Sequence, residues 1–370
     1  MSNQQVMLEQ YDSWLADDSD VAALVMRQWL EPVEGKDAIV FPPTYAKPER
    51  AREDDWLGYN IDRFEDGSSV CQIDSVGSQA NRMEPIFKRE KYQQLVPQVV
   101  IQAGDRRIHL LDAGHRAADA IVRFSDLKEE FKKAFNSLKQ GDAEPLAKLA
   151  PTSLVFGVWD SRDTQVKVSR IVRSVIRAFN VRVVHRSAQY VPPIDYVANR
   201  LIDEPNTKTD RDRISELGLN HAPAPWTHGG VQVIGEIRRD VALNLSALRA
   251  LGAGDDRTLP LRRYILGLAL VSVTAPSELS LREGCQLVLD ANRPVEWTVV
   301  QYDGTHAPFA LLHADALQYA KVAATEFGVG SDRISTFREQ KVKEWLSQSK
   351  EDRKRSRRST NSSGTEEDQG

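Results

Sequence analysis

The sequence is poor in cysteine and has no long apolar run, and both features narrow the class of protein. Its 370 residues include two cysteines, Cys71 and Cys285, which lie far apart and outside any CxxC motif, so the sequence predicts neither a disulfide framework nor a cysteine zinc site. The longest apolar run, residues 264–275, is too short to cross a bilayer and is typical of a buried strand or helix. The N-terminus lacks the basic and apolar regions of a signal peptide. We therefore expect a protein of the reducing cytoplasm with no membrane role.

The motifs of common enzymes are also missing. The sequence contains no Walker A loop, no GxSxG, no HExxH and no GxGxxG after a strand, and its seven histidines form no metal-ligand pattern. Three carboxylates are candidates for a general base or a metal ligand: Asp112 in DAGHR, and Asp160 with Asp163 in WDSRD. A helix cap or an ion pair is the commoner role of such residues at turns. The sequence therefore predicts no catalytic residue, no metal and no cofactor.

The overall charge gives no sign of nucleic-acid binding, but one segment differs from the rest. The formal net charge is −4 and the pI is near 6.0, so any site for a polyanion must be local. Between residues 157 and 190, seven basic side chains stand against Asp160 and Asp163. The seven are Arg162, Lys167, Arg170, Arg173, Arg177, Arg182 and Arg186. Such an excess is typical of a surface that contacts a phosphate backbone, although a solvated helix face is the alternative.

Residues 166–177, VKVSRIVRSVIR, contain most of these basic side chains. At about 100° per residue in a helix, the basic residues fall on one side and the valines and isoleucines on the other. The segment therefore predicts an amphipathic helix with a basic face. The following residues, FNVRVVHRSAQYV, alternate as in a strand and present Arg182 and either His185 or Arg186 to one surface.

A second polar segment lies upstream, in SVCQIDSVGSQANRMEPIF. It predicts a short strand from Val70, a Ser or Asp cap, and a helix that ends near Pro85. Gly77 and Ser78 lie near the helix start, where free backbone N–H groups can meet phosphate oxygens. Gln79, Asn81 and Arg82 add donors for sugar, phosphate or base, while close packing against another helix is an equal alternative.

Strands and helices alternate along most of the chain, which predicts an α+β fold with helices on one face of a sheet. The length allows one elaborated domain or two. Residues 1–69 read as a helical lead-in, up to about residue 38, followed by a proline-rich and charged insertion. Residues 70–348 form the main domain, interrupted at about 188–229 by a second long excursion. Residues 349–370 are a charged tail that we expect to be disordered.

Several segments, in order, resemble a known family. They are CQIDSVGSQANRMEP, GHRAADAIVRFSD, LAPTSLVFGVWDSRDTQVKVSRIVRS, RSAQYVPP and GGVQVIGEIRRDVALNLSALR, and the resemblance runs from about Val70 to Ala320. The family is the backbone subunit of type I-G (formerly I-U) CRISPR effector complexes, a member of the RAMP superfamily. The first residues, the insertion before Val70 and the tail contribute little to it.

The resemblance implies a ferredoxin-like, RRM-type palm with large insertions called fingers and thumb. It implies a non-catalytic subunit that polymerises along crRNA as a helical filament and presents the guide for pairing with target DNA in antiviral defence. Base pairing then reads the sequence while protein holds the backbone. The implied partners are crRNA, target DNA, copies of the chain itself, a large subunit, a subunit that processes and caps the guide, and a helicase-nuclease recruited later.

Site residues follow from the resemblance together with the charge pattern. We expect the thumb in residues 188–229, with Tyr190, Val191 or Trp226 as a wedge between bases. Arg238 and Arg239 are further candidates for RNA binding, although an arginine pair there could equally bridge Asp240 or a neighbouring subunit. The expected guide-backbone contacts are Ser78, Gln79, Asn81, Arg82, Arg116, Arg162, Lys167, Arg170, Arg173, Arg177 and Arg186.

Two other functions stay open at this stage. One is a metal-dependent, RNA-guided endoribonuclease on the same scaffold, with Asp112, Asp160 or Asp163 as the acid; related type III backbone subunits cleave RNA with a loop aspartate, whereas type I backbones generally do not. The other is a stand-alone binder of single-stranded nucleic acid, which predicts salt-sensitive binding by a monomer.

Overall fold

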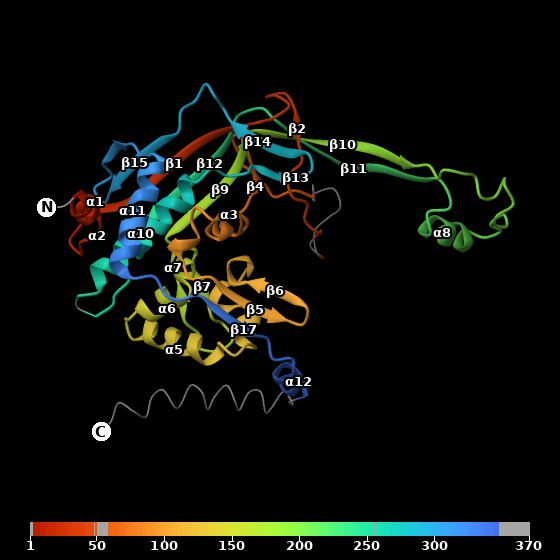
Figure 1. Ribbon diagram of the computed structural model, residues 1–370. Coiled ribbons are helices and arrows are strands. Elements are labelled where there is room, and N and C mark those ends of the chain that lie inside the picture. Colours follow the sequence, from red (N-terminus) through yellow and green to blue (C-terminus); the bar gives the residue numbers. More distant parts are fainter. Residues whose placement is uncertain (1–2, 48, 50–57, 255, 348–370) are drawn as a thin grey trace.

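The chain is built around a nine-stranded sheet whose neighbouring strands are antiparallel (Figure 1). The computed structural model describes residues 3–47, 49, 58–254 and 256–347. The main strand order is β13 (Ser280–Arg282), β14 (Cys285–Leu289), β1 (Val21–Pro32), β12 (Ile237–Asn244), β9 (Val172–Phe179), β4 (Ser69–Asp74) and β3 (Ile61–Arg63). Two further strands, β15 (Glu296–Gln301) and β16 (His306–Phe309), extend the sheet beside β1.

Helices cover one side of this sheet. The long helices α10 (Thr258–Thr274) and α11 (His313–Phe327) pack on it, with α3 (Val76–Met83) further along. Alternate residues of the central strands, such as Leu24, Met26 and Leu243, are buried beneath these helices because successive strand side chains point to opposite faces. The short helices α1 (Asn3–Glu9), α2 (Asp12–Leu15) and α9 (Leu245–Arg249) close the same layer at one end. The predicted α+β class is confirmed.

A smaller layer lies below the helices in Figure 1. Its three-stranded sheet has the order β17 (Arg333–Thr336), β5 (Val99–Ala103) and β6 (Arg106–His109), with β17 parallel to β5. Around it lie α4 (Ala120–Arg123), α5 (Lys128–Lys139), α6 (Glu144–Leu149), α7 (Pro151–Phe156), the β7 (Val158–Trp159) and β8 (Lys167–Val168) hairpin, and α12 (Glu339–Ser347). Phe131 of α5 and Leu146 of α6 belong to the same apolar core as Leu24. The two layers therefore share one core.

A long two-stranded arm leaves this body. Strand β10 (Val181–Tyr190) pairs with β11 (Ala222–Val233), and the short β2 (Ile39–Val40) joins them at the base. The arm projects away from the body and bears helix α8 (Lys208–Glu216) at its far end (Figure 1). The predicted excursion at residues 188–229 forms the outer part of this arm.

Two local predictions were wrong, and both errors exchange a helix for a strand. Residues 166–177 form β8 and most of β9, because Val172, Val175 and Ile176 are β-branched and lie between β12 and β4 in the sheet. The helical lead-in ends at Leu15, and β1 is a central strand. The predicted tail, 349–370, lies outside the described residues, and within them no helix is long and apolar enough to cross a membrane.

Candidate nucleic-acid interface

Strand β9 divides the basic residues that a helix would have kept together. Arg173 and Arg177 project to one face of the sheet with Val175, while Ser174 and Ile176 project to the helix-covered face. Arg170 lies before the strand, and its guanidinium donates a 3.3 Å hydrogen bond to the carbonyl oxygen of Val76 at the start of α3. The basic residues that were predicted to share one helix face therefore lie on two surfaces, which meet at the beginning of β9.

Six basic residues between residues 157 and 190 are exposed and have no carboxylate partner among the described residues. The Nζ of Lys167 lies 5.8 Å from the centre of the Trp159 ring, which is itself 58% exposed. Partial burial, together with the charge of Arg116, lowers the pKa of Arg170. These six are therefore the residues of the segment whose positive charge is available to an external anion: Arg162, Lys167, Arg170, Arg173, Arg182 and Arg186.

Arg177 and Arg238 are different, because they are held in a charge network on the uncovered face of the sheet. Asp240 accepts from Nη2 of Arg177 at 2.8 Å, and its other oxygen lies 2.8 Å from Nε of Arg238 and 3.4 Å from Nε of Arg27. Arg238 also pairs with Glu236, and its guanidinium lies over the ring of Phe179. Both arginines are therefore paired with carboxylates of the chain. For Arg238 this is the bridge to Asp240 given as the alternative to RNA binding, whereas the pairing of Arg177 was not predicted.

Sequence reasoning missed two arginines of this network. Arg27 comes from β1, a segment predicted as helix, and so its place beside Asp240 could not be deduced. Arg293 donates to Glu236 at 2.6 Å and lies over the ring of Trp29, 4.0 Å from its centre. The only hint of a strand was the apolar run at residues 21–26 just before Arg27, which fits a buried strand as well as a helix.

Helix α3 has the predicted cap, but several of the polar side chains that were predicted to contact RNA bond within the chain instead. Ser75 accepts a 3.2 Å hydrogen bond from the backbone N–H of Ser78, which confirms a serine N-cap. The buried carboxylate of Asp74 then accepts from Ser78 Oγ and Gln79 Nε2, both at 2.7 Å, and from Arg82 Nε at 3.1 Å. Gln79 is only 3% exposed, so its prediction as an RNA contact is wrong; Ser78 is half-buried and bonded inward. Asn81 and Arg82 remain at the surface.

Arg116 was predicted to bind RNA and is instead a core residue. It is 4% exposed, its Nε lies 2.7 Å from Oε2 of the buried Glu84, and its guanidinium lies over the Phe156 ring. Its φ of 53° is a left-handed conformation that side chains other than glycine seldom adopt. Burial raises the pKa of Glu84 to about 7, because loss of hydration outweighs the opposing effects of Arg116 and a hydrogen bond from Thr152. The buried pair of Arg116 and Glu84 therefore has a structural role.

Arg239 was also a candidate for RNA binding and is buried instead. It is 2% exposed on the helix-covered side, where Nε donates to Ser174 Oγ and Nη1 to Gln28 Oε1, both at 3.0 Å. Burial lowers the pKa of Arg239 to about 10, so the side chain stays charged at neutral pH. The adjacent pair Arg238 and Arg239 points to opposite faces of β12, as expected for neighbours in a strand.

The residues proposed as base wedges lie on the arm. Tyr190 ends β10 and is 49% exposed, and Val191 follows it at 58%. Trp226 lies within β11, but its side chain is outside the described residues. Both described side chains are accessible to a ligand.

The three candidate catalytic carboxylates are each bonded within the chain. Asp112 lies 2.5 Å from Nζ of Lys88, and Asp163 lies 3.5 Å from Nζ of Lys132. Asp160 is buried and accepts from the backbone N–H and the hydroxyl of Thr164, both at 2.8 Å. In the part of the chain that the structure describes, no group of three His, Cys, Asp or Glu side chains is arranged to hold a metal ion.

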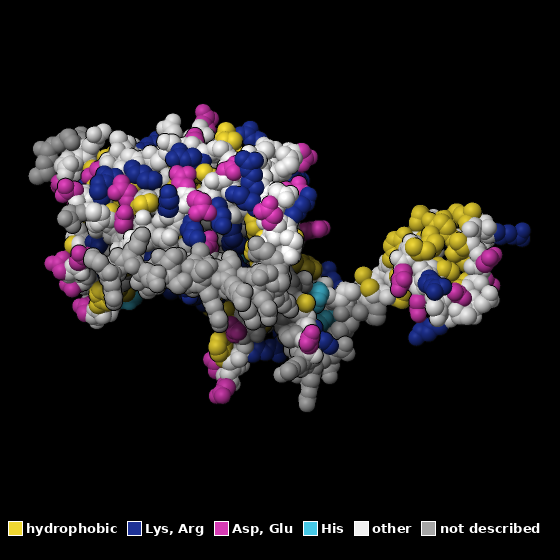
Figure 2. All heavy atoms as spheres, turned by 90° about the horizontal axis from the view of Figure 1, so that it is seen from below, with side chains coloured by type: hydrophobic (Ala, Val, Ile, Leu, Met, Phe, Trp, Pro, Cys, Tyr) yellow, Lys and Arg dark blue, Asp and Glu magenta, His cyan; other side chains and the backbone are white. Residues whose placement is uncertain are grey.

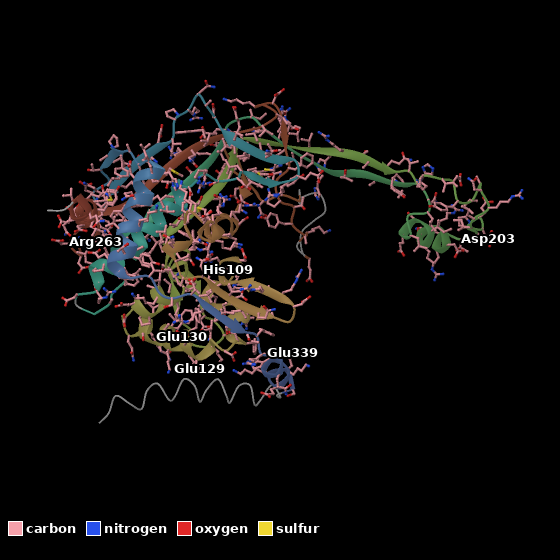
Figure 3. The ribbon with its side chains drawn as sticks, in the orientation of Figure 1. His109, Glu129, Glu130, Asp203, Arg263 and Glu339 are labelled. Carbon is pink, nitrogen blue, oxygen red and sulfur yellow. The ribbon has the colours of Figure 1, made fainter. Side chains whose placement is uncertain are left out.

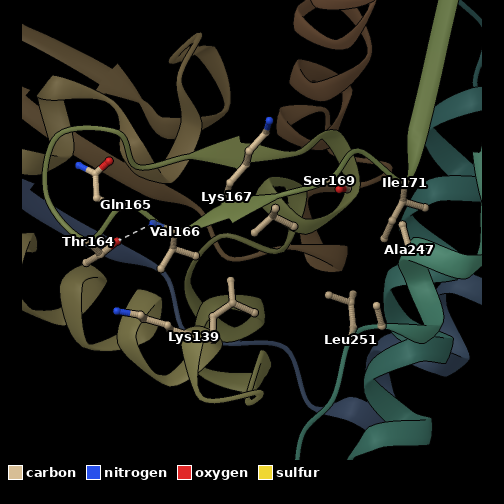
Figure 4. A pocket seen from close by; sticks show the side chains of 12 residues that line it. Lys139, Thr164, Gln165, Val166, Lys167, Ser169, Ile171, Ala247 and Leu251 are labelled. Carbon is tan, nitrogen blue, oxygen red and sulfur yellow. Dashed lines mark hydrogen bonds between the residues drawn. The ribbon is translucent and has the colours of Figure 1, made fainter. Parts of the chain in front are cut away.

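An open cavity of about 460 Å³ lies between the β7–β8 hairpin and α9 (Figure 4). Its lining is mainly aliphatic, with Lys139 and Lys167 at its edge. The aliphatic side chains come from α5, from the segment leading into β9, and from α9 and the residues after it: Leu138, Val166, Val168, Ile171, Ala247, Ala250 and Leu251.

Comparison with known proteins agrees with the family recognised from the sequence. Residues 24–183 match the model of a family described as "CRISPR-associated protein GSU0053 (Cas_GSU0053)". The match is to a CRISPR-associated family, which agrees with the resemblance at that level. The matched segment runs from β1 to the base of the arm and includes five of the six available basic residues.

Further comparisons add little. Among curated proteins no significant match is found. Several chains of solved structures match, including one from "CRISPR RNA-guided surveillance complex, pre-nicking", which is 13% identical and has a TM-score of 0.31. That similarity covers 82% of this chain and 86% of the other, and at such a TM-score it carries no structural argument.

Proposed function

We propose that this chain is a non-catalytic backbone subunit of a CRISPR effector complex, which polymerises along crRNA and presents the guide to target DNA. The observation that carries the proposal is the group of six exposed basic residues that have no carboxylate partner in the part of the chain that the structure describes, while the net charge of the sequence is −4. A subunit that contacts copies of itself needs such a group only where the RNA passes. Overall acidity is then compatible with RNA binding.

The position of the six residues supports one path for a phosphate backbone. Arg162 and Lys167 belong to the β7–β8 hairpin, Arg170 and Arg173 flank the start of β9, and Arg182 and Arg186 lie on the arm. Asn81 and Arg82 at the exposed side of α3 lie near this path, since Arg170 itself bonds to the first residue of α3. Tyr190 and Val191, further out on the arm, are proposed as the wedge that separates bases.

The proposed partners are crRNA, target DNA, further copies of the chain, a large subunit and a guide-capping subunit. The lack of catalysis is also part of the proposal. It is supported by Asp112, Asp160 and Asp163, each of which already bonds to a lysine or a threonine. Cleavage of complementary RNA that requires Mg²⁺ and is abolished by Asp→Ala at one of these positions would favour the endoribonuclease instead.

The test is RNA affinity as a function of salt for the triple variant Arg162→Ala, Arg170→Ala, Arg173→Ala. Each lost phosphate contact is expected to lower the salt slope by about one, so the triple variant should show a slope smaller by about three. Arg338→Ala is the matched control, because Arg338 is an exposed arginine that pairs with Asp126 at 2.7 Å on the smaller layer. An unchanged slope in the triple variant would exclude this surface as the RNA site.

A further inference from the structure

Trp159 is exposed in a part of the chain where the other large hydrophobic side chains are covered. Its side chain is 58% exposed, and between residues 65 and 189 no other large hydrophobic side chain is exposed. Hydrophobic side chains gather instead at the far end of the arm (Figure 2). A single exposed hydrophobic residue does not by itself mark a contact surface, so the side chains around the indole decide what it can contact.

The β7–β8 hairpin holds the indole in a fixed place. Helix α7 before it has all six residues buried, and Gly157 joins helix to strand at a φ of 78°, which favours glycine. In the turn, the buried carboxylate of Asp160 accepts two hydrogen bonds from Thr164, and the backbone N–H of Asp160 donates a 2.9 Å hydrogen bond to the carbonyl oxygen of Val166. A ligand that binds the hairpin therefore does not have to order it first.

Strand pairing places Trp159 and Lys167 together on the outer face of the hairpin. Val158 lies opposite Val168, and Trp159 lies opposite Lys167. The two valines face the apolar core, so the next pair points outward, because successive strand side chains alternate between faces. Figure 4 shows Lys167 projecting from β8 away from the aliphatic cavity. At 5.8 Å from the ring centre, Nζ of Lys167 is near the outer limit of a cation–π contact and can turn to a phosphate.

Three of the six available basic residues lie on or beside this hairpin. Arg162 belongs to the turn between the two strands, and Lys167 lies next to the indole. Arg170 passes over Gly157, since a Cβ at Gly157 would lie 2.7 Å from Cγ of Arg170. The indole of Trp159 is therefore accompanied by positive charge that can meet an external anion.

The carboxylates of the hairpin and of the adjacent helix do not cancel this charge. Asp160 is buried in the turn, and Asp163 lies 3.5 Å from Nζ of Lys132 in α5. Glu129 and Glu130, the two glutamates of α5, lie at the lower side of the body (Figure 3). An aromatic face beside cations is the combination with which proteins hold single-stranded nucleic acid.

We propose that Trp159 stacks on an unpaired base of the RNA, while Arg162 and Lys167 hold the phosphates next to that base. The inference rests on the proposed function and deepens it, because it assigns a base contact to the body of each copy, apart from the arm. Nucleic acid is favoured over a protein partner, since every nucleotide supplies an anion and an aromatic face together. Every base has such a face, so the contact is independent of sequence, as a subunit that accepts any guide requires.

The experiment compares two single-stranded RNAs that hold one copy: oligouridine, and an abasic strand with the same number of phosphates. Trp159→Leu removes the aromatic ring and keeps an apolar side chain, whereas Trp159→Phe keeps a ring; the position is exposed, so folding should be retained. Trp345→Leu is the matched control, because Trp345 is a 40% exposed tryptophan of α12. Affinity is measured across a salt series, and mass is measured by light scattering on longer RNA.

The expected result is a loss that depends on the bases. Trp159→Leu should bind oligouridine about 5- to 150-fold more weakly than the parent, with the same salt slope, since no phosphate contact is removed. On the abasic strand the two proteins should agree within about twofold. Trp159→Phe should lose less than Trp159→Leu, and Trp345→Leu should bind like the parent. Equal affinity of Trp159→Leu and the parent for oligouridine, or an equal loss on both strands, would overturn the inference.

Failure of this inference and failure of the proposed function give different results. If the parent grows with RNA length but Trp159→Leu shows no base-dependent loss, the stacking is overturned and the backbone subunit stands. A base-dependent loss in a protein that stays one-to-one with RNA of every length upholds the stacking and overturns the backbone subunit. If Trp159→Leu binds the short RNA like the parent but no longer grows on longer RNA, Trp159 contacts a neighbouring protein and the stacking is overturned. A parent that binds neither strand overturns both.

Discussion

Arg177 donates a 2.8 Å hydrogen bond to the carboxylate of Asp240, whereas Arg173, two positions along the same face of β9, has no carboxylate partner among the described residues. The two arginines are alike in the sequence and differ only in what the neighbouring strand places opposite them. Arg173 faces Ala242 of β12, and Arg177 lies next to Arg238 and within reach of Asp240.

This difference predicts unequal effects on RNA binding. Arg173→Ala should reduce the salt dependence of RNA binding by about one phosphate contact, because its charge is free to meet the RNA. Arg177→Ala should have a smaller effect on RNA and leave Asp240 with fewer partners. Filter binding across a salt series would measure the salt dependence of RNA binding for both variants. An equal reduction in the two would show that the ion pair with Asp240 does not prevent Arg177 from contacting RNA.

Burial of Glu84 predicts a pH dependence of stability. The pKa of Glu84 is raised by burial to about 7, above the ordinary value of 4.5, so between these values the folded chain keeps a proton that the unfolded chain releases. The free energy of unfolding should therefore fall as the pH rises from about 5 to about 7.5, by at most about 1.4 kcal/mol per pH unit from this group. Urea titrations of the parent and of Glu84→Gln would show it, since the variant lacks this proton. Parallel pH profiles for the two proteins would contradict the assignment.

Arg239 predicts a loss of stability without a loss of RNA binding. Arg239→Ala removes the buried partner of Ser174 and Gln28 and leaves a cavity, which together should cost about 2–4 kcal/mol of unfolding free energy. The folded fraction should bind RNA as the parent does. Thermal unfolding and RNA titration on the same samples give both quantities, and weaker RNA binding at unchanged stability would restore Arg239 as a contact.

The contact between α10 and α11 predicts a penalty for a single methyl group. A Cβ at Gly267 would lie 2.8 Å from Cα of Ala320, and this backbone atom has little room to shift. Gly267→Ala should lower the free energy of unfolding by about 1–3 kcal/mol, although alanine favours a helix by about 1 kcal/mol. At Gly254 nothing lies within 4 Å of an added Cβ, so Gly254→Ala is the control and should stay within about 0.5 kcal/mol of the parent. Equal stability of both variants would show that the helices separate freely here.

Local patterns identified some elements well. The strand before α3, its serine cap and its end before Pro85 followed from residue types within a few positions of one another. The outer part of the arm coincides with residues 188–229, which were predicted as a long excursion from the main domain. In such segments the nearest neighbours in the chain determine the structure.

The errors have a common physical cause, which is contact between residues far apart in the sequence. VKVSRIVRSVIR satisfies the helix period, yet Val172 to Ile176 lies between two strands, and pairing across the sheet decides its conformation. Arg116 and Arg239 look like surface arginines, and only the fold brings Glu84 to one and Ser174 to the other. The network of Arg27 and Arg293 was missed for the same reason.

The most direct test of the central claim is the mass of the protein, by light scattering, on RNAs of increasing length. The triple variant Arg162→Glu, Arg170→Glu, Arg173→Glu is compared with the parent and with Arg338→Glu. We predict stepwise growth with RNA length for the parent and for Arg338→Glu, and its loss in the triple variant. A fixed complex of one protein with one RNA at every length would contradict the backbone subunit and leave a stand-alone binder, and growth of the triple variant like the parent would contradict the placement of the RNA on these residues.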